Sequence, residues 1–101
     1  MAKSKEEIIN DIDNHLQKSG KQYYSEFYVG ITNDFEHRLF EEHNVNKDTM
    51  WWIYRTANSK SVAEEIEKYY LDLGMKGNTG GGNDDSKIVY CYAIGPTTYD
   101  H

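Results

Sequence analysis

One segment constrains the fold of this chain more than any other: a short aromatic strand that ends at a glycine and leads straight into a helix. Residues 28–43 carry it, with Tyr28 and Gly30 at the end of the strand and Asp34 in the first turn of the helix. A glycine at a strand end lets another backbone or a ligand approach closely. Acidic side chains are favoured in the first turn of a helix, so the segment predicts a strand followed directly by a helix.

Helix-type and strand-type patterns alternate along the 101 residues. Ser4 and Glu7 form a capping box in front of an apolar helical stripe that ends near Gly20. The other expected elements are strands at 22–30, 50–56 and 87–94 and helices at 34–44 and 61–73. A glycine-rich loop over 74–86 precedes the last strand. This order predicts a single α+β domain over residues 1–101, with a three-stranded, mostly antiparallel sheet flanked by three helices.

Cysteine content and hydropathy indicate the cellular compartment in which the protein is expected. The single cysteine, Cys91, allows no internal disulfide and suits a reducing compartment. No apolar run approaches the roughly 18 to 20 residues of a transmembrane helix, and the N-terminus has no hydrophobic signal core. We therefore expect a cytoplasmic protein with no membrane partner.

The residues of the strand-helix segment suit one kind of chemistry. Tyr28, Arg38 and His43 follow one another along it and can converge on one surface. An arginine stabilises anionic charge, and a tyrosine hydroxyl positions or deprotonates a nucleophile. A carboxylate from elsewhere in the chain would hold a metal ion. Together such groups are suited to handling a phosphodiester.

At these positions the chain resembles the GIY-YIG nuclease family. Tyr28-Val29-Gly30 is similar to the second half of the family motif, and a later helix carries the pattern found around the metal-binding glutamate of the family. The further matching positions are Thr32, Asn33, Phe35 and Arg38 after the strand, and Ala63, Glu67 and Lys68 in the later helix. The resemblance spans a motif core over about residues 22–73.

The resemblance implies a divalent-metal-dependent endonuclease that hydrolyses phosphodiester bonds of nucleic acid, with DNA as the expected substrate. It implies that Tyr28, Arg38, His43 and Glu67 are catalytic, and that Glu67 holds Mg²⁺ or another divalent cation such as Mn²⁺. Mg²⁺ typically takes only one or two protein carboxylates, so a single glutamate suffices. Arg38 and Glu67 are expected to be exposed.

The chain departs from the family in the place of its first strand. The strand that carries the GIY half should lie shortly before Tyr28, where this chain has the end of a helix. We therefore predict a permuted arrangement, in which the C-terminal strand 87–94 takes that position and brings the catalytic Tyr92 beside Tyr28. Tyr90 shares the face of Tyr92 by strand alternation and is the second candidate. The N-terminal helix, within 1–20, would be an addition that covers a face or an edge of the sheet.

A second departure concerns the histidine. In the family it usually stands one residue closer to the arginine, where this chain has Glu42. One residue corresponds to about 100° of rotation around an α-helix. His43 therefore reaches the site of Arg38 only if the helix is locally distorted.

The net charge of the chain leaves functions other than that of a nuclease open. The chain has 17 acidic and 11 basic residues and a formal net charge of −6, whereas proteins that bind the phosphate backbone usually carry an excess of Lys and Arg. The acidic balance predicts weak, salt-sensitive binding of substrate, or a partner that delivers the nucleic acid. A catalytically idle module that binds nucleic acid or protein is one alternative. A small phage-type accessory protein is another, and homodimerisation also stays open.

Overall fold

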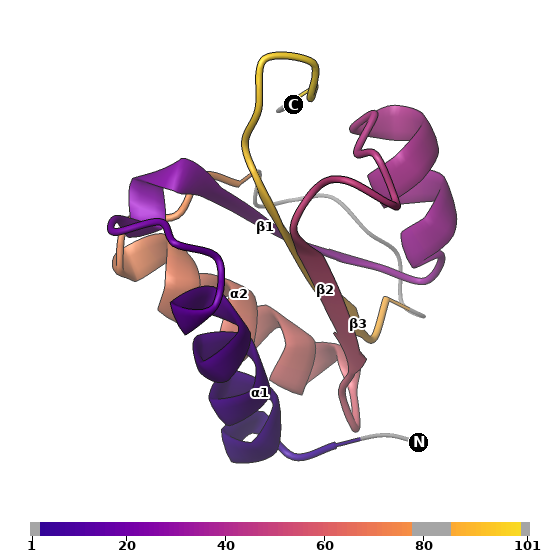
Figure 1. Ribbon diagram of the computed structural model, residues 1–101. Coiled ribbons are helices and arrows are strands. Elements are labelled where there is room, and N and C mark those ends of the chain that lie inside the picture. The colour runs from indigo at the N-terminus through magenta and orange to yellow at the C-terminus, as the bar shows by residue number, and fades with distance from the viewer. Residues whose placement is uncertain (1–2, 78–85, 100–101) are drawn as a thin grey trace.

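The computed structural model describes residues 3–77 and 86–99 of the chain (Figure 1). In chain order the elements are α1 (Lys5–Gln17), η1 (Tyr24–Glu26), β1 (Phe27–Thr32), η2 (His37–Glu42), β2 (Trp52–Thr56), α2 (Lys60–Asp72) and β3 (Ile88–Ala93). All strand pairs are antiparallel, and the strand order is β1-β3-β2. The predicted α+β fold with a three-stranded sheet and flanking helices is confirmed. Of the predicted loop 74–86, residues 78–85 lie outside the described part.

The sheet is covered by helices on both faces (Figure 1). Strand alternation sends Val29, Ile53 and Val89 to the face against which α1 and α2 pack. It sends Tyr28 and Tyr90 to the opposite face, where η2 lies. One face is therefore mainly aliphatic and structural, and the other is built from polar aromatic side chains.

The N-terminal helix α1 begins as the sequence predicted. The Ser4 hydroxyl accepts a hydrogen bond from the backbone N–H of Glu7, and the Glu7 carboxylate accepts one from the N–H of Ser4. The buried stripe of α1 packs against β2 and α2. Arg55 of β2 also donates to Asp11 of α1 at 2.9 Å. The helix thus covers one face of the sheet.

The first strand differs from the prediction at both ends. It spans Phe27–Thr32 rather than 22–30. The Glu26 carboxylate accepts hydrogen bonds from the backbone N–H groups of Gln22 and Tyr23, which closes a 3₁₀ turn where the strand was expected to begin. Gly30 does not end the strand, because pairing with β3 continues through Thr32.

Candidate active site

The helix that carries Arg38 is wound as a π-helix over His37–Glu42. The backbone N–H of His43 donates to the carbonyl of Arg38 at 2.8 Å, an i→i+5 bond in place of the α-helical i→i+4 bond. The wider turn brings His43 back over Arg38 despite the extra residue between them. This is the local distortion that the spacing required. Single π turns occur frequently at functional sites.

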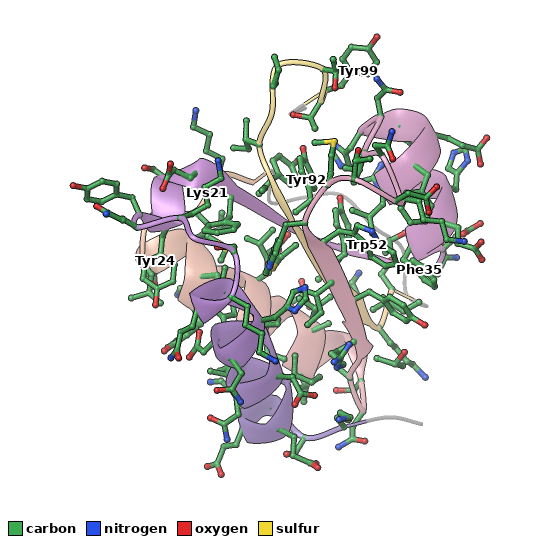
Figure 2. The ribbon with its side chains drawn as sticks, in the orientation of Figure 1. Lys21, Tyr24, Phe35, Trp52, Tyr92 and Tyr99 are labelled. Atoms are coloured by element: carbon green, nitrogen blue, oxygen red, sulfur yellow. The ribbon has the colours of Figure 1, made fainter. Side chains whose placement is uncertain are left out.

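His43 is buried, with 1% of its surface exposed, in a network of polar groups. Its Nε2 lies 2.8 Å from the Tyr90 hydroxyl. Its Nδ1 lies within hydrogen-bond distance of the Tyr99 backbone carbonyl and 3.2 Å from the Tyr92 hydroxyl. Both ring nitrogens of His43 therefore contact tyrosine hydroxyls of β3, and Nδ1 also contacts the C-terminal segment. In Figure 2, Tyr92 lies on β3 and Tyr99 lies in that segment.

Gly30 sets the position of the Tyr90 side chain. The two residues are directly opposite in the β1–β3 register. A Cβ atom at position 30 would lie only 2.5 Å from the Tyr90 hydroxyl oxygen and 2.6 Å from Cζ, so the ring lies across the glycine. The Tyr28 ring stacks beside it, with centroids 6.5 Å from Tyr90 and 5.2 Å from Tyr92.

Arg38 lies beside the Tyr90 hydroxyl and is one-third exposed. Burial raises the pKa of Tyr90, and the neighbouring positive charge of Arg38 opposes that rise. Arg38 also pairs with Glu42 at 3.1 Å. It lines an open cleft of about 300 Å³ together with Thr32 and Ser86. The guanidinium therefore faces both the buried tyrosine and a space that is accessible to a ligand.

Glu67 is buried, contrary to expectation, with 6% of its surface exposed. It lies on the side of α2 that also buries Ala63 and Ile66. Within the described residues its carboxylate makes no hydrogen bond or ion pair. Burial, followed by the charge of Glu64, raises the pKa of Glu67 to about 7. The carboxylate is also close enough to raise the pKa of Tyr90.

Two of the predicted site residues, Arg38 and His43, lie at the Tyr90 hydroxyl. The Tyr28 ring stacks beside the Tyr90 ring, and the charge of Glu67 is near enough to raise the pKa of Tyr90. The fifth, Tyr92, stacks against the Tyr28 ring, but its hydroxyl faces the Nδ1 side of His43. The sequence feature that distinguishes Tyr90 from Tyr92 is Gly30. Only the tyrosine opposite this glycine has room for its ring to lie across the edge strand β1.

Comparison with protein-family models, curated proteins and solved structures finds no match to this chain. In the part of the chain that the structure describes, no helix has the length and apolar composition needed to cross a membrane. A functional assignment therefore depends on the arrangement of the residues around Tyr90.

Replacing Gly30 by alanine tests how tightly Tyr90 is held. The added methyl group overlaps the Tyr90 ring, and we expect a loss of about 1 to 3 kcal/mol in the free energy of unfolding, as for other overpacked sites. Thermal and urea unfolding measure it. Gly95→Ala is the control, because its methyl group meets only the flexible end of Met50 at 3.1 Å. Equal stabilities of the two variants would contradict the close approach.

Proposed function

We propose that this protein is a divalent-metal-dependent endonuclease that hydrolyses phosphodiester bonds of nucleic acid, with DNA as its substrate. The observation that carries the proposal is that Arg38 and His43 lie at the Tyr90 hydroxyl, with the buried carboxylate of Glu67 near enough to raise the pKa of Tyr90. This set combines a cation for the phosphate, a proton acceptor and a carboxylate without a described partner. The resemblance of the same segments to the GIY-YIG nuclease family supports it.

The proposed chemistry follows from the two contacts of the Tyr90 hydroxyl. Tyr90 passes its proton to Nε2 of His43, and its oxygen then takes a proton from the attacking water. The water oxygen bonds to phosphorus as the bond to the leaving oxygen breaks, and that oxygen takes a proton from solvent. Arg38 donates to the phosphate oxygens, where negative charge accumulates. Burial raises the pKa of Tyr90 above its ordinary value, and the adjacent positive charge of Arg38 opposes that rise and so favours the tyrosinate.

Glu67 would hold the metal ion. A buried carboxylate without a described partner and with its pKa raised to about 7 fits the oxygen-ligand chemistry of Mg²⁺ or Mn²⁺. In the described residues there is no group of three or more histidine, cysteine or acidic side chains that could hold a metal. Mg²⁺ typically takes only one or two protein carboxylates, so the proposal needs no such group. When bound, the cation would supply positive charge that polarises the phosphodiester.

A catalytically idle binding module is the second candidate. The formal charge of −6 favours it, because backbone-binding nucleases usually carry a basic surface. Such a module would bind nucleic acid or a protein without turnover. Cleavage assays separate the two functions.

The test is nicking of supercoiled, single-stranded and branched DNA with and without Mg²⁺ or Mn²⁺. We expect metal-dependent cleavage, and a loss of about 10²-fold or more in Tyr90→Phe, the scale of a general-base contribution. Tyr92→Phe should lose less, since the Tyr92 hydroxyl faces the other side of the imidazole. Tyr23→Phe is the control, because Tyr23 is exposed and lines a separate pocket beside α1. Absence of cleavage on every substrate would favour the binding module.

A further inference from the structure

The C-terminal segment 95–99 turns back onto the end of η2. The backbone N–H of Tyr99 donates to the carbonyl of His43 at 2.8 Å. The Asn44 side-chain amide donates to the carbonyl of Thr97 at 2.9 Å. A turn between Gly95 and Thr98 is closed by three hydrogen bonds. The segment is therefore held on the helix by several contacts independent of the Tyr99 side chain, which is largely exposed.

One of these contacts determines which nitrogen of His43 carries the hydrogen. The Tyr99 carbonyl lies against Nδ1, and a backbone carbonyl can only accept. Nδ1 must therefore be the donor. A neutral imidazole has one N–H, so Nε2 is left with a lone pair and accepts from the Tyr90 hydroxyl. His43 is almost completely buried, and water has little access to replace the carbonyl.

The Tyr92 hydroxyl does not impose this choice. It lies 3.2 Å from Nδ1 and donates to the Tyr99 carbonyl at 3.4 Å. A hydroxyl can donate or accept, so Tyr92 alone is compatible with either tautomer of His43. Of these two groups on the Nδ1 side, the Tyr99 carbonyl is the one that can only accept.

We infer that the C-terminal turn is a positioning element of the site. Its Tyr99 carbonyl fixes His43 as the Nδ1–H tautomer and so keeps Nε2 ready to take the proton of Tyr90. The catalytic consequence rests on the proposed nuclease function, whereas the tautomer itself does not. Tyr99 contributes through its backbone and does not touch the reacting atoms.

Two shortened chains test the inference. A chain that ends at Tyr99 keeps an acceptor oxygen at the position of the carbonyl, and a chain that ends at Thr98 lacks it. Long-range ¹H–¹⁵N NMR spectra report the protonation of each ring nitrogen of His43. We expect the Nδ1–H tautomer in the full chain and in the chain ending at Tyr99, and a mixture of tautomers in the chain ending at Thr98.

Cleavage of supercoiled DNA with Mg²⁺ provides the second measurement. The chain ending at Thr98 should lose about tenfold or more, a part of the roughly 10² to 10⁴ that proton transfer contributes. If no chain cleaves DNA but the tautomer changes as expected, the proposed function fails and the positioning role stands. An unchanged tautomer in the chain ending at Thr98, or Nε2–H in the full chain, overturns the inference.

A point variant covers the case in which the chain ending at Thr98 does not fold. Asn44 has a positive φ of 57°, which glycine adopts without strain. Asn44→Gly therefore keeps the backbone and removes only the amide that anchors the Thr97 carbonyl. It should also give mixed tautomers. Thr97→Ala is the matched control, since Asn44 binds the backbone and not the side chain of Thr97, and it should keep the Nδ1–H tautomer.

Discussion

Glu67→Gln is expected to abolish metal-dependent cleavage and, at pH 8, to make the protein more stable. Both effects follow from a buried carboxylate that has no described hydrogen-bond or ion-pair partner. The amide keeps the shape of the side chain but cannot supply the charge that a divalent cation requires. Glu65→Gln is the matched control, because Glu65 lies on the same helix and its side chain is 58% exposed. Residual metal-dependent activity in Glu67→Gln would exclude Glu67 as the metal ligand.

The stability effect depends on pH in a defined direction. Burial raises the pKa of Glu67 from 4.5 to about 7, so the folded protein keeps this proton at pH values where the unfolded chain has lost it. Stability contributed by the protonated group is complete below pH 4.5, falls as the pH rises towards 7, and is lost above it. Glu67→Gln removes this dependence. The variant should match the wild type at low pH and exceed it at pH 8 by on the order of 2 to 3 kcal/mol in the free energy of unfolding.

Thermal unfolding at pH 4.5 and pH 8 measures this difference, with and without Mg²⁺. Binding to the folded state alone stabilises a protein by mass action, so Mg²⁺ should raise the melting temperature of the wild type at pH 8. It should do so less at pH 5.5, where the Glu67 carboxyl is largely protonated, and not at all in Glu67→Gln. Equal responses of wild type and variant to Mg²⁺ would place the metal elsewhere.

The elements were predictable because their signals are local. The capping box of Ser4 and Glu7 and the alternation along β3 define a helix and a strand without reference to the rest of the chain. The start of β1 was not predictable in this way. Its residues have strand propensity, but the Glu26 carboxylate binds the backbone N–H groups just upstream and a turn forms instead. A side chain that competes for backbone hydrogen bonds overrides propensity.

The sequence predicted which residues to consider for a site, but not how they are arranged. The spacing of Tyr28, Arg38 and Glu67 brought these residues into consideration, but burial of Glu67 depends on how α2 packs against the sheet. The π turn at His43 is likewise invisible in a helical pattern that assumes α geometry. The choice between Tyr90 and Tyr92 required the strand register, because both side chains point to the same face of the sheet.

Arg38→Ala is expected to lower cleavage by about 10²-fold or more, the usual effect of losing a charge-stabilising group. The loss has two causes, since Arg38 faces the cleft and also lowers the pKa of Tyr90. Arg38→Lys should recover only part of the activity, because an ammonium lacks the planar fork that binds two phosphate oxygens. Arg55→Ala is the control, as Arg55 pairs with Asp11 on the other face of the sheet. Wild-type activity in Arg38→Ala would contradict the mechanism.

Removing the carboxylate of Glu42 should have the opposite effect to removing Arg38, because it should favour the binding of DNA. Its carboxylate pairs with Arg38 at 3.1 Å and competes with a phosphate for it. Since partly exposed ion pairs are worth about 0.2 to 1 kcal/mol, Glu42→Gln should strengthen the binding of a DNA oligonucleotide by about 1.4- to fivefold at low salt. Glu41→Gln changes the net charge by the same amount without contacting Arg38, so the difference between the two variants isolates the ion pair. Equal affinities would show that Arg38 does not meet the phosphate, because only an arginine engaged by the substrate gains from losing its competitor.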